Sequence, residues 1–396
     1  MFDLKRIEEA AKILEPVIKK NPIIQLNHHE KDIYLKCENL QLTGSFKLRG
    51  ALHKTARLSE EEKSRGVIAC SAGNHAQGVA LSATRLGIPS TICLPASAPL
   101  SKVEATKGYG GSVVLVDGVY DDAYQEALRL RDRDNLTFIH PFNDPDVMAG
   151  QGTIGLEIIK SIPDLDTVVV SIGGGGLISG VAVAVKSINP NCKVIGVQAS
   201  KIASMKASVD AGAIVELPGA ATIADGIAVK KPGDKTYEMV QKWVDEIVTV
   251  DEEEIAYAML YLMERNKMVS EGAGAATVAA VLYNKVKLSG KTCCLISGGN
   301  VDMNIVSKII SLGSFKSGRL TEITTPVPNK PGELMKLLGL LKEMGTNILT
   351  IDQFTDHVKA DIDSMVVRVV VESRNEEHRR EIYRKLSDAG YCCFSL

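Results

Sequence analysis

The chain has 396 residues, which predicts two or three domains, and its 45% apolar and 24% charged residues are typical of a globular protein and exclude a disordered or collagen-like chain. With 46 basic against 48 acidic residues, it has no excess charge to attract nucleic acid or a membrane. The sequence has no run of 18 apolar residues that would predict a membrane span, and its charged amphipathic start lacks the apolar stretch of a secretion signal. Eight cysteines without a Cys-x-x-Cys pair favour reduced, buried thiols, so we expect a cytoplasmic protein.

From about residue 65, short apolar runs alternate with helical stretches. Strands are expected over residues 66–70, 90–95, 111–118, 167–172, 193–198 and 291–297, and a helix over 74–86. Near-continuous β-branched runs joined by helices predict a parallel sheet with both faces covered. Small residues follow three of the strands, in SAGNH, SIGGGGL and SGGN. Since ligands of open α/β sheets bind at the carboxyl ends of the strands, these three turns predict the ligand site.

The pattern changes near residue 318. The remaining sequence predicts the ferredoxin-like order βαββαβ: a strand over 319–327, a helix over 329–345, strands over 346–357 and 363–373, a helix over 375–390 and a last strand over 391–396. We place the linker at 313–318. The first domain is then 1–317, with a smaller lobe at roughly 40–145, and the second is 320–396.

Four consecutive glycines, Gly173, Gly174, Gly175 and Gly176, follow an expected strand and open an expected helix. Such a loop lets several backbone N–H groups converge on one phosphate at a helix N-terminus. A flexible turn is the alternative, but a turn needs only one or two glycines, and each costs conformational entropy. The run is neither a dinucleotide-binding fingerprint nor a P-loop, which favours a simple phosphate group.

Lys47 lies in ENLQLTGSFKLRGA, residues 38–51, between small residues and an aromatic side chain. A solvated lysine is the alternative interpretation, although it needs no such surroundings. Together with a monophosphate cradle, a lysine suggests pyridoxal phosphate, an aldehyde cofactor that a lysine carries as a Schiff base.

The motifs SFKLRGA, SAGNHAQG, SIGGGGLISG and ISGGN, in this order, resemble those of the fold-type II pyridoxal phosphate enzymes and, more narrowly, the threonine dehydratase (threonine ammonia-lyase) family. The resemblance covers roughly residues 5–315. It implies a two-lobed parallel-sheet catalytic domain, pyridoxal 5'-phosphate as the cofactor, and β-elimination that converts L-threonine to 2-oxobutanoate and ammonia. L-serine would be a secondary substrate, because only one methyl contact separates the two amino acids.

The resemblance also assigns roles to matching residues. Lys47 would hold the cofactor and remove the substrate Cα proton, and Phe46 would lie against the pyridine ring. Ser297 would face the pyridine nitrogen, where a neutral hydroxyl suits elimination; a hydroxyl that caps the next turn is the alternative. Asn74 would bind the ring hydroxyl. The phosphate would be held by Gly173, Gly174, Gly175, Gly176 and Leu177, and the substrate carboxylate by the loop of Ser71, Gly73, Asn74 and His75.

The sequence differs from that of the related serine racemases in two features, and these differences indicate which activity to expect. Serine racemases resemble this chain but carry a serine base where Ala72 stands here, and they bind a divalent metal where this chain has Gln198 and Ser204. Elimination without racemisation is therefore expected, and no metal site. A serine dehydratase or racemase-like enzyme and an inactive small-molecule sensor remain the alternatives. Glu271 lies either near the cofactor or at the edge of the core, and 28–29 is expected to be a surface loop.

The C-terminal pattern resembles an ACT domain, a small regulatory module. Its NKPGEL (329–334) and GTNILTID (345–352) segments match the family's helix start and following turn, which implies an effector site at Pro331, Gly332 and Asn347. Isoleucine is the first candidate effector, and AMP or ADP acting on the catalytic domain is the second. A purely structural or dimerisation domain is the alternative. We expect a homo-oligomer, a dimer or a tetramer.

Overall fold

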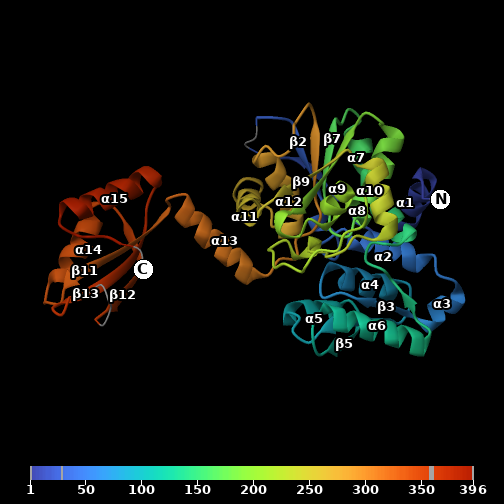
Figure 1. Ribbon diagram of the computed structural model, residues 1–396, viewed down its shortest axis with the longest axis horizontal. Helices are drawn as coiled ribbons and strands as arrows, with labels where there is room; N and C mark the ends of the chain where they lie inside the picture. Colours follow the sequence, from blue (N-terminus) through green and yellow to red (C-terminus); the bar gives the residue numbers. More distant parts are fainter. Residues whose placement is uncertain (1, 28–29, 356–360, 395–396) are drawn as a thin grey trace. The chain divides into compact units, whose positions relative to one another are not determined.

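The structure is a computed structural model that describes residues 2–27, 30–355 and 361–394 (Figure 1). Its chain forms two compact units, which divide between Asp302 and Met303. The division lies earlier than the linker expected at 313–318, because helix α13 (Met303–Lys316) continues through most of that segment and buries Val306 and Ile309. Only Ser317 and Gly318 form a turn there. The expected segment 28–29 lies outside the described residues.

The larger part of the first unit is built on a six-stranded sheet with the order β1-β2-β10-β7-β8-β9. β1 pairs with β2 in antiparallel orientation, and the other neighbours are parallel. The strands are β1 (Ile23–Gln25), β2 (Ile33–Cys37), β7 (Thr167–Ser171), β8 (Lys193–Ala199), β9 (Glu246–Val250) and β10 (Thr292–Ile296). The parallel strands expected over 167–172, 193–198 and 291–297 are confirmed; β1, β2 and β9 were not foreseen.

Helices and short turns complete this part. α12 packs against β7, β8, β9 and β10, and α8 against β7 and β8. Buried apolar residues of α7, α8, β7 and β10 form its main core. The helical segments are α1 (Leu4–Leu14), α7 (Pro145–Ser161), α8 (Gly176–Ile188), η2 (Ser200–Ile202), α9 (Ser204–Ala211), η3 (Asp225–Ile227), α10 (Asp234–Trp243), α11 (Glu252–Tyr261), η4 (Leu262–Asn266) and α12 (Gly272–Leu282).

A second, fully parallel sheet with the order β5-β4-β3-β6 forms the smaller lobe of this unit. Alternate residues of β3 enter different cores: Val67 and Ala69 pack with α2 and α4, whereas Ile68 and Cys70 pack with α6. Both faces are therefore covered, which explains the continuous apolar runs in its strands. The elements are η1 (Glu38–Leu40), α2 (Lys47–Ala56), α3 (Glu60–Arg65), β3 (Val67–Cys70), α4 (Asn74–Arg85), β4 (Ser90–Pro95), α5 (Leu100–Gly108), β5 (Ser112–Val116), α6 (Tyr120–Asp134) and β6 (Thr137–Phe138).

The second unit contains an antiparallel sheet with the order β11-β13-β12. Two helices pack on it through apolar residues such as Leu337, Leu341 and Ile382. The elements after α13 are β11 (Leu320–Pro328), α14 (Glu333–Glu343), β12 (Asn347–Phe354), β13 (Ser364–Glu372) and α15 (Glu376–Asp388). They reproduce the first five elements of the expected βαββαβ order; residues 356–357 of the expected strand lie outside the described residues.

The last expected strand is wrong over Tyr391–Phe394, which has no strand conformation. The Phe394 N–H donates a backbone hydrogen bond of 2.8 Å to the Thr324 carbonyl of β11, and Cys392 is exposed. Residues 395–396 lie outside the described segments, so the C-terminal unit forms βαββα within them.

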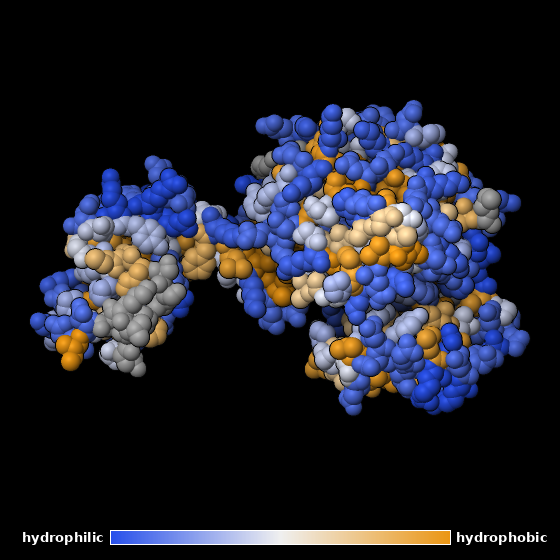
Figure 2. Space-filling model, viewed as in Figure 1, coloured by the Kyte–Doolittle hydropathy of each residue, from blue (hydrophilic) through white to orange (hydrophobic). Residues whose placement is uncertain are grey.

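The surface of both units is mostly hydrophilic, with apolar side chains showing at several places (Figure 2). On α13, Met303 and Leu312 are more than half exposed. Within the described segments no helix combines the length and the apolar character that a bilayer crossing requires.

Candidate active site

A cavity of about 740 Å³ lies where turns from the two sheets of the first unit come together. It is bordered by the segments that follow β3, β7 and β10, the three turns singled out by their small residues. The predicted residues around it are Phe46, Lys47, Ser71, Gly73, Asn74, His75, Gly173, Gly174, Gly175, Gly176, Leu177 and Ser297. The structure thus brings all of them to one cavity, while their roles toward a cofactor and substrate stay predictions.

Lys47 is the first residue of α2, and the neighbouring chain fixes its place. The Phe46 N–H donates to the Ser297 carbonyl at 3.0 Å, and Ser45 forms a β-bridge with Gly298, so the segment before Lys47 is tied to the turn after β10. The Lys47 amine lies 5.3 Å from the centre of the Phe46 ring and donates to the Pro141 carbonyl at 3.0 Å.

Burial sets the protonation of this amine. Desolvation lowers the pKa of Lys47 to about 8, and the charge of Glu271 opposes the shift. A lysine with a lowered pKa is neutral in a larger fraction of molecules at neutral pH, and only the neutral amine can attack a carbonyl or accept a proton. The site therefore contains an activated lysine.

Two helix N-termini open on the cavity without a side-chain cap. α4 begins at Asn74 after Gly73, and α8 begins at Gly176 after Gly175; neither preceding residue accepts a capping hydrogen bond. The first N–H groups of a helix have no partner within the helix and carry its positive dipole end, so they bind anions. One cavity therefore offers two anion-binding ends, which suits one phosphate and one carboxylate.

The four-glycine loop is closely packed against Phe142. A Cβ added at Gly174 would overlap the Phe142 ring, and one at Gly176 would lie 2.8 Å from the Phe142 backbone. Gly175 has a φ of +94°, which favours glycine. Close packing and a left-handed turn thus require these glycines, which argues against the alternative of a flexible connection.

The side chains of Asn74 and His75 are already engaged. Asn74 Nδ2 donates to both carboxylate oxygens of Glu271, at 2.9 and 3.0 Å, and Asn74 Oδ1 accepts from Asn300 Nδ2 at 2.8 Å. His75 Nε2 donates to the Ile139 carbonyl at 2.8 Å, and burial, followed by the charge of Lys47, lowers its pKa to about 3. His75 is therefore neutral, and what it offers to a ligand is its backbone N–H at the helix start.

Glu271 and His140 also border the cavity. Glu271 was expected either near the cofactor or at the edge of the core, and the structure shows it at the cavity that contains the predicted site residues. His140 was missed; its Nδ1 accepts from the N–H groups of Phe142 and Asn143, and burial lowers its pKa to about 4. The signal that could have revealed it is its position directly after the short apolar run that forms β6.

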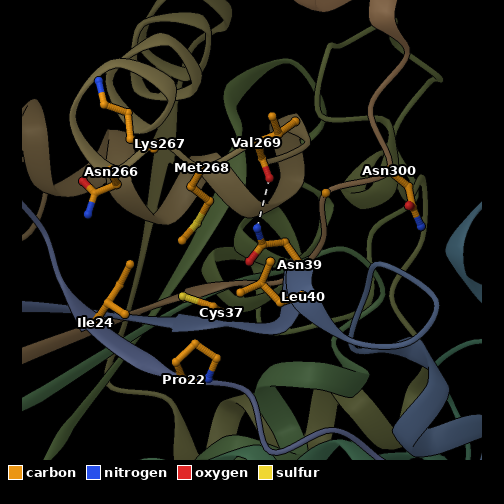
Figure 3. Close-up of a pocket in the computed structure, with 11 residues that line it drawn as sticks. Pro22, Ile24, Cys37, Asn39, Leu40, Asn266, Lys267, Met268, Val269 and Asn300 are labelled. Atoms are coloured by element: carbon orange, nitrogen blue, oxygen red, sulfur yellow. Dashed lines mark hydrogen bonds between the residues drawn. The ribbon is translucent and has the colours of Figure 1, made fainter.

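A second cavity of about 420 Å³ lies beside β1, β2 and the segment after η4 (Figure 3). Asn39 donates across it to the Val269 carbonyl at 3.0 Å. Asn300 borders both cavities, but none of the residues predicted for the catalytic site lines this one.

The positions that departed from the serine racemase pattern have ordinary surroundings. Ala72 borders the main cavity and supplies no ionisable group. Gln198 donates to the Ile172 carbonyl and accepts from the Lys206 N–H, and Ser204 donates to the Val229 carbonyl. Over residues 2–27, 30–355 and 361–394, no three His, Cys, Asp or Glu side chains are grouped as metal ligands.

Comparison with known proteins shows the family to which the chain belongs. The model of the pyridoxal-phosphate-dependent enzyme family matches residues 14–299, so the chain belongs to this family. It is 50% identical over 396 residues to an L-threonine ammonia-lyase of Thermotoga maritima, covering 99% of this chain and 98% of that protein. It is 48% identical over 322 residues to the catabolic L-threonine dehydratase TdcB of Staphylococcus aureus, covering 79% of this chain and 93% of that protein.

Solved structures give the same fold. The processed form of threonine deaminase isoform 2 from Solanum lycopersicum matches with a TM-score of 0.73 and 36% identity, covering 78% of this chain and 94% of that one. Maize serine racemase matches with a TM-score of 0.74 and 35% identity, covering 79% and 98%. The fold is thus shared by eliminating and racemising enzymes, and the site must distinguish them.

Proposed function

We propose that the chain is an L-threonine ammonia-lyase that uses pyridoxal 5'-phosphate to convert L-threonine to 2-oxobutanoate and ammonia. The observation that carries the proposal is the buried Lys47 amine in one cavity with two uncapped helix N-termini. The 50% identity to an L-threonine ammonia-lyase over almost the whole chain supports the substrate.

The residues fit the cofactor. Lys47 offers the amine for a covalent link, the Phe46 ring offers an apolar face, and the glycine loop at the start of α8, with Leu177, offers N–H groups for the phosphate. Ser297, buried at the end of β10, would face the pyridine nitrogen, and Asn74 the ring hydroxyl. When bound, the cofactor supplies an electron sink joined to the substrate Cα.

The protein's own groups then perform the remaining work. The N-terminus of α4, at Ser71, Gly73, Asn74 and His75, would hold the substrate carboxylate through N–H groups. Once the substrate amine has replaced it on the cofactor, the free Lys47 Nζ would take the Cα proton, and the β-hydroxyl would gain a proton and leave as water. Ala72 has no group that could return a proton to Cα from the opposite side, so elimination follows rather than inversion.

The direct test measures 2-oxoacid formation from L-threonine and L-serine by the purified holoenzyme. We expect 2-oxobutanoate from threonine and slower pyruvate formation from serine, since a methyl contact is worth about 1–3 kcal/mol. Chiral chromatography of the remaining serine should find no appreciable D-serine. D-serine forming as fast as pyruvate would establish a racemase, and a protein without visible cofactor absorbance or turnover would be the inactive sensor.

For the C-terminal unit we propose an ACT domain that binds a small effector near Pro331, Gly332 and Asn347. Gly332 precedes α14 with a φ of +89° and provides no side-chain cap. The Glu333 N–H donates to the Lys330 carbonyl at 3.3 Å, so the N–H groups that follow it in the first turn of α14 would bind a carboxylate. Asn347 Nδ2 donates to Glu372 at 3.0 Å, so this amide would have to exchange its partner when the effector binds.

Threonine saturation curves of the full chain, with and without isoleucine, valine, AMP and ADP, test this proposal. We expect isoleucine to shift the apparent threonine affinity by about 5–150-fold and Asn347→Ala to reduce the shift. A response to AMP or ADP that Asn347→Ala leaves intact would place the effector on the catalytic unit. No response to any of the four would make the C-terminal unit structural.

We also propose a cytoplasmic homo-oligomer, a dimer or a tetramer. Support for the compartment comes from eight cysteines that are all free thiols. Support for the oligomer comes from exposed apolar side chains such as Met303 and Leu312 of α13. Light scattering after size-exclusion chromatography measures the oligomer, and a monomer at micromolar concentration would contradict it.

A further inference from the structure

Glu271 is a buried carboxyl group that the proposed chemistry does not use. It is 5% exposed, borders the main cavity and immediately precedes α12. The Glu271 side chain accepts no hydrogen bond from the first turn of α12 and so does not cap the helix. Both of its oxygens accept instead from Asn74 Nδ2. The carboxyl group is thus directed into the site.

No cation within the described chain forms an ion pair with Glu271, whereas the buried Glu38 elsewhere in this unit is paired with Arg49. Burying a carboxylate without a paired cation is unfavourable for stability. Titratable groups held in such an environment within a cavity concentrate at functional sites. The position of Glu271 therefore indicates a functional rather than a stabilising role.

Glu271 and Asn300 together determine which way the Asn74 amide points. Asn300 Nδ2 donates to Asn74 Oδ1 at 2.8 Å and to the Thr43 carbonyl at 2.7 Å, so it presents a donor to Asn74. An ionised carboxylate presents only acceptors. In the structure the amide nitrogen of Asn74 faces Glu271 and its oxygen faces Asn300, which is the orientation that an ionised Glu271 requires. Loss of the Glu271 acceptors would remove one of these two constraints.

Charged groups from several elements face this pair. Burial raises the pKa of Glu271 to about 7; Asn74, Lys102 and Lys47 act against the shift, and Asp225 adds to it. Lys47, with its pKa lowered to about 8, is also near His75 and His140, both of which stay neutral. Glu271 and Lys47 therefore titrate in the same range and influence each other's proton.

We propose that Glu271 is a positioning residue of the active site. It orients the Asn74 amide, and its negative charge favours the protonated form of the Lys47 amine across the cavity. The inference rests on the proposed function only for the catalytic roles of Lys47 and Asn74. In this role the Glu271 carboxylate is a fixed hydrogen-bond acceptor for Asn74 and a negative charge near Lys47. No covalent bond forms or breaks at Glu271.

The first measurement is the rate at which cofactor-free protein takes up pyridoxal 5'-phosphate as a function of pH, followed by visible absorbance. Glu271→Gln should move the midpoint of this profile toward acid by about 0.5–1 pH unit, because loss of the negative charge lowers the pKa of Lys47 and leaves its amine neutral at lower pH. Glu271→Asp keeps the charge and should keep the midpoint.

The second measurement is threonine turnover by the same variants. Both should lower kcat about tenfold or more with a smaller change in KM, because the Asn74 amide is no longer held. The control is Glu216→Gln, an acidic residue at the same cavity that pairs with Lys231 and whose side chain is 61% exposed. It should change neither the uptake midpoint nor kcat.

An unchanged uptake midpoint in Glu271→Gln, or an equal shift in Glu216→Gln, would overturn the proposal. If Glu271→Gln does not fold, the test rests on Glu271→Asp. An unchanged kcat in that variant, or a shifted pH midpoint of cofactor uptake, would contradict the proposal. Cofactor uptake is measured without substrate, so a wild-type protein that ignores threonine would refute the proposed function and leave this test in force.

Discussion

Each unit of the molecule contains an arginine–glutamate ion pair, and the two pairs differ in their exposure to solvent. In the catalytic unit, Arg49 binds Glu38 through two hydrogen bonds of 2.8 Å, and both side chains are 0% exposed. In the C-terminal unit, Arg368 also donates two hydrogen bonds to Glu322, of 2.9 and 2.6 Å, but both reach the same carboxylate oxygen, and these side chains are 37% and 33% exposed. The same kind of ion pair is thus fully buried in one unit and half-exposed in the other, although both units have an apolar core.

The surroundings of Arg49 explain the difference. Arg49 also contacts Glu157, which in turn pairs with the buried Lys36 of β2, so four charged side chains connect α2, α7 and the large sheet. Lys47 is on the same helix as Arg49, two residues before it. The buried network therefore fixes the helix that carries the proposed catalytic amine.

The largest effect should come from Lys47→Ala. Turnover should fall by at least about 10³-fold, and the visible absorbance of the bound cofactor should disappear, because one amine serves as both anchor and base. The matched control is Lys385→Ala, which removes an exposed lysine of α15 that pairs with Glu381. The control should retain wild-type kcat and absorbance; full activity in Lys47→Ala would refute the mechanism.

The two arginine pairs should differ strongly in stability. Glu38→Ala leaves Arg49 buried and partly unpaired, which should cost about 3–5 kcal/mol of unfolding free energy. Glu322→Ala should cost less than about 1 kcal/mol, because Arg368 turns to water. Hydrogen exchange of the amides in β2 and β13 measures the two losses separately. Equal losses would remove the distinction between the units.

Glycines provide a third contrast. Gly174→Ala should destabilise the catalytic unit by about 1–3 kcal/mol and weaken cofactor binding, since its Cβ would overlap the Phe142 ring. Gly339→Ala, within α14, meets nothing within 4 Å and should stabilise the C-terminal unit by about 0.5–1 kcal/mol. Cofactor titration and hydrogen exchange check the pair. A Gly174→Ala protein with wild-type affinity would show that the loop has space to spare.

Acid should weaken the catalytic unit through His140. Its pKa in the folded protein is about 4, so as the pH falls below 6.5 the unfolded chain binds a proton that the folded chain does not. The corresponding stability is complete above pH 6.5 and is lost as the pH falls toward 4. His140→Asn keeps an acceptor for the Phe142 and Asn143 N–H groups but does not titrate.

Between pH 7 and pH 5, the unfolding free energy of His140→Asn should therefore fall by about 1–2 kcal/mol less than that of the wild type. Fluorescence of Trp243, the single tryptophan, reports this unit alone because it lies in α10. Parallel pH profiles of the two proteins would contradict the assignment of the acid sensitivity to His140.

Local patterns in the sequence were sufficient for much of the fold and of the predicted site. Continuous apolar runs identified β3, β4, β7, β8 and β10, because strands buried on both faces need no polar positions. The run of β5 was equally recognisable, although this edge strand is partly exposed. The glycine run and Lys47 were recognisable because the chemistry each suggests depends on neighbouring residues in the chain. The order of elements in the C-terminal unit followed from the same kind of local periodicity, up to α15.

Tertiary structure decided what depends on residues far apart in the chain. Asn74 and Glu271 are 197 positions apart, and only the tertiary structure shows that their side chains are hydrogen-bond partners. The need for glycine at position 174 comes from Phe142, on another segment. The expectations differed from the structure at α13 and at Tyr391–Phe394. Helix α13 depends on apolar surface against which Val306 and Ile309 are buried, and a strand at Tyr391–Phe394 would need a ladder of hydrogen bonds to a neighbouring strand. Sequence periodicity carries neither, because both are supplied by other parts of the fold.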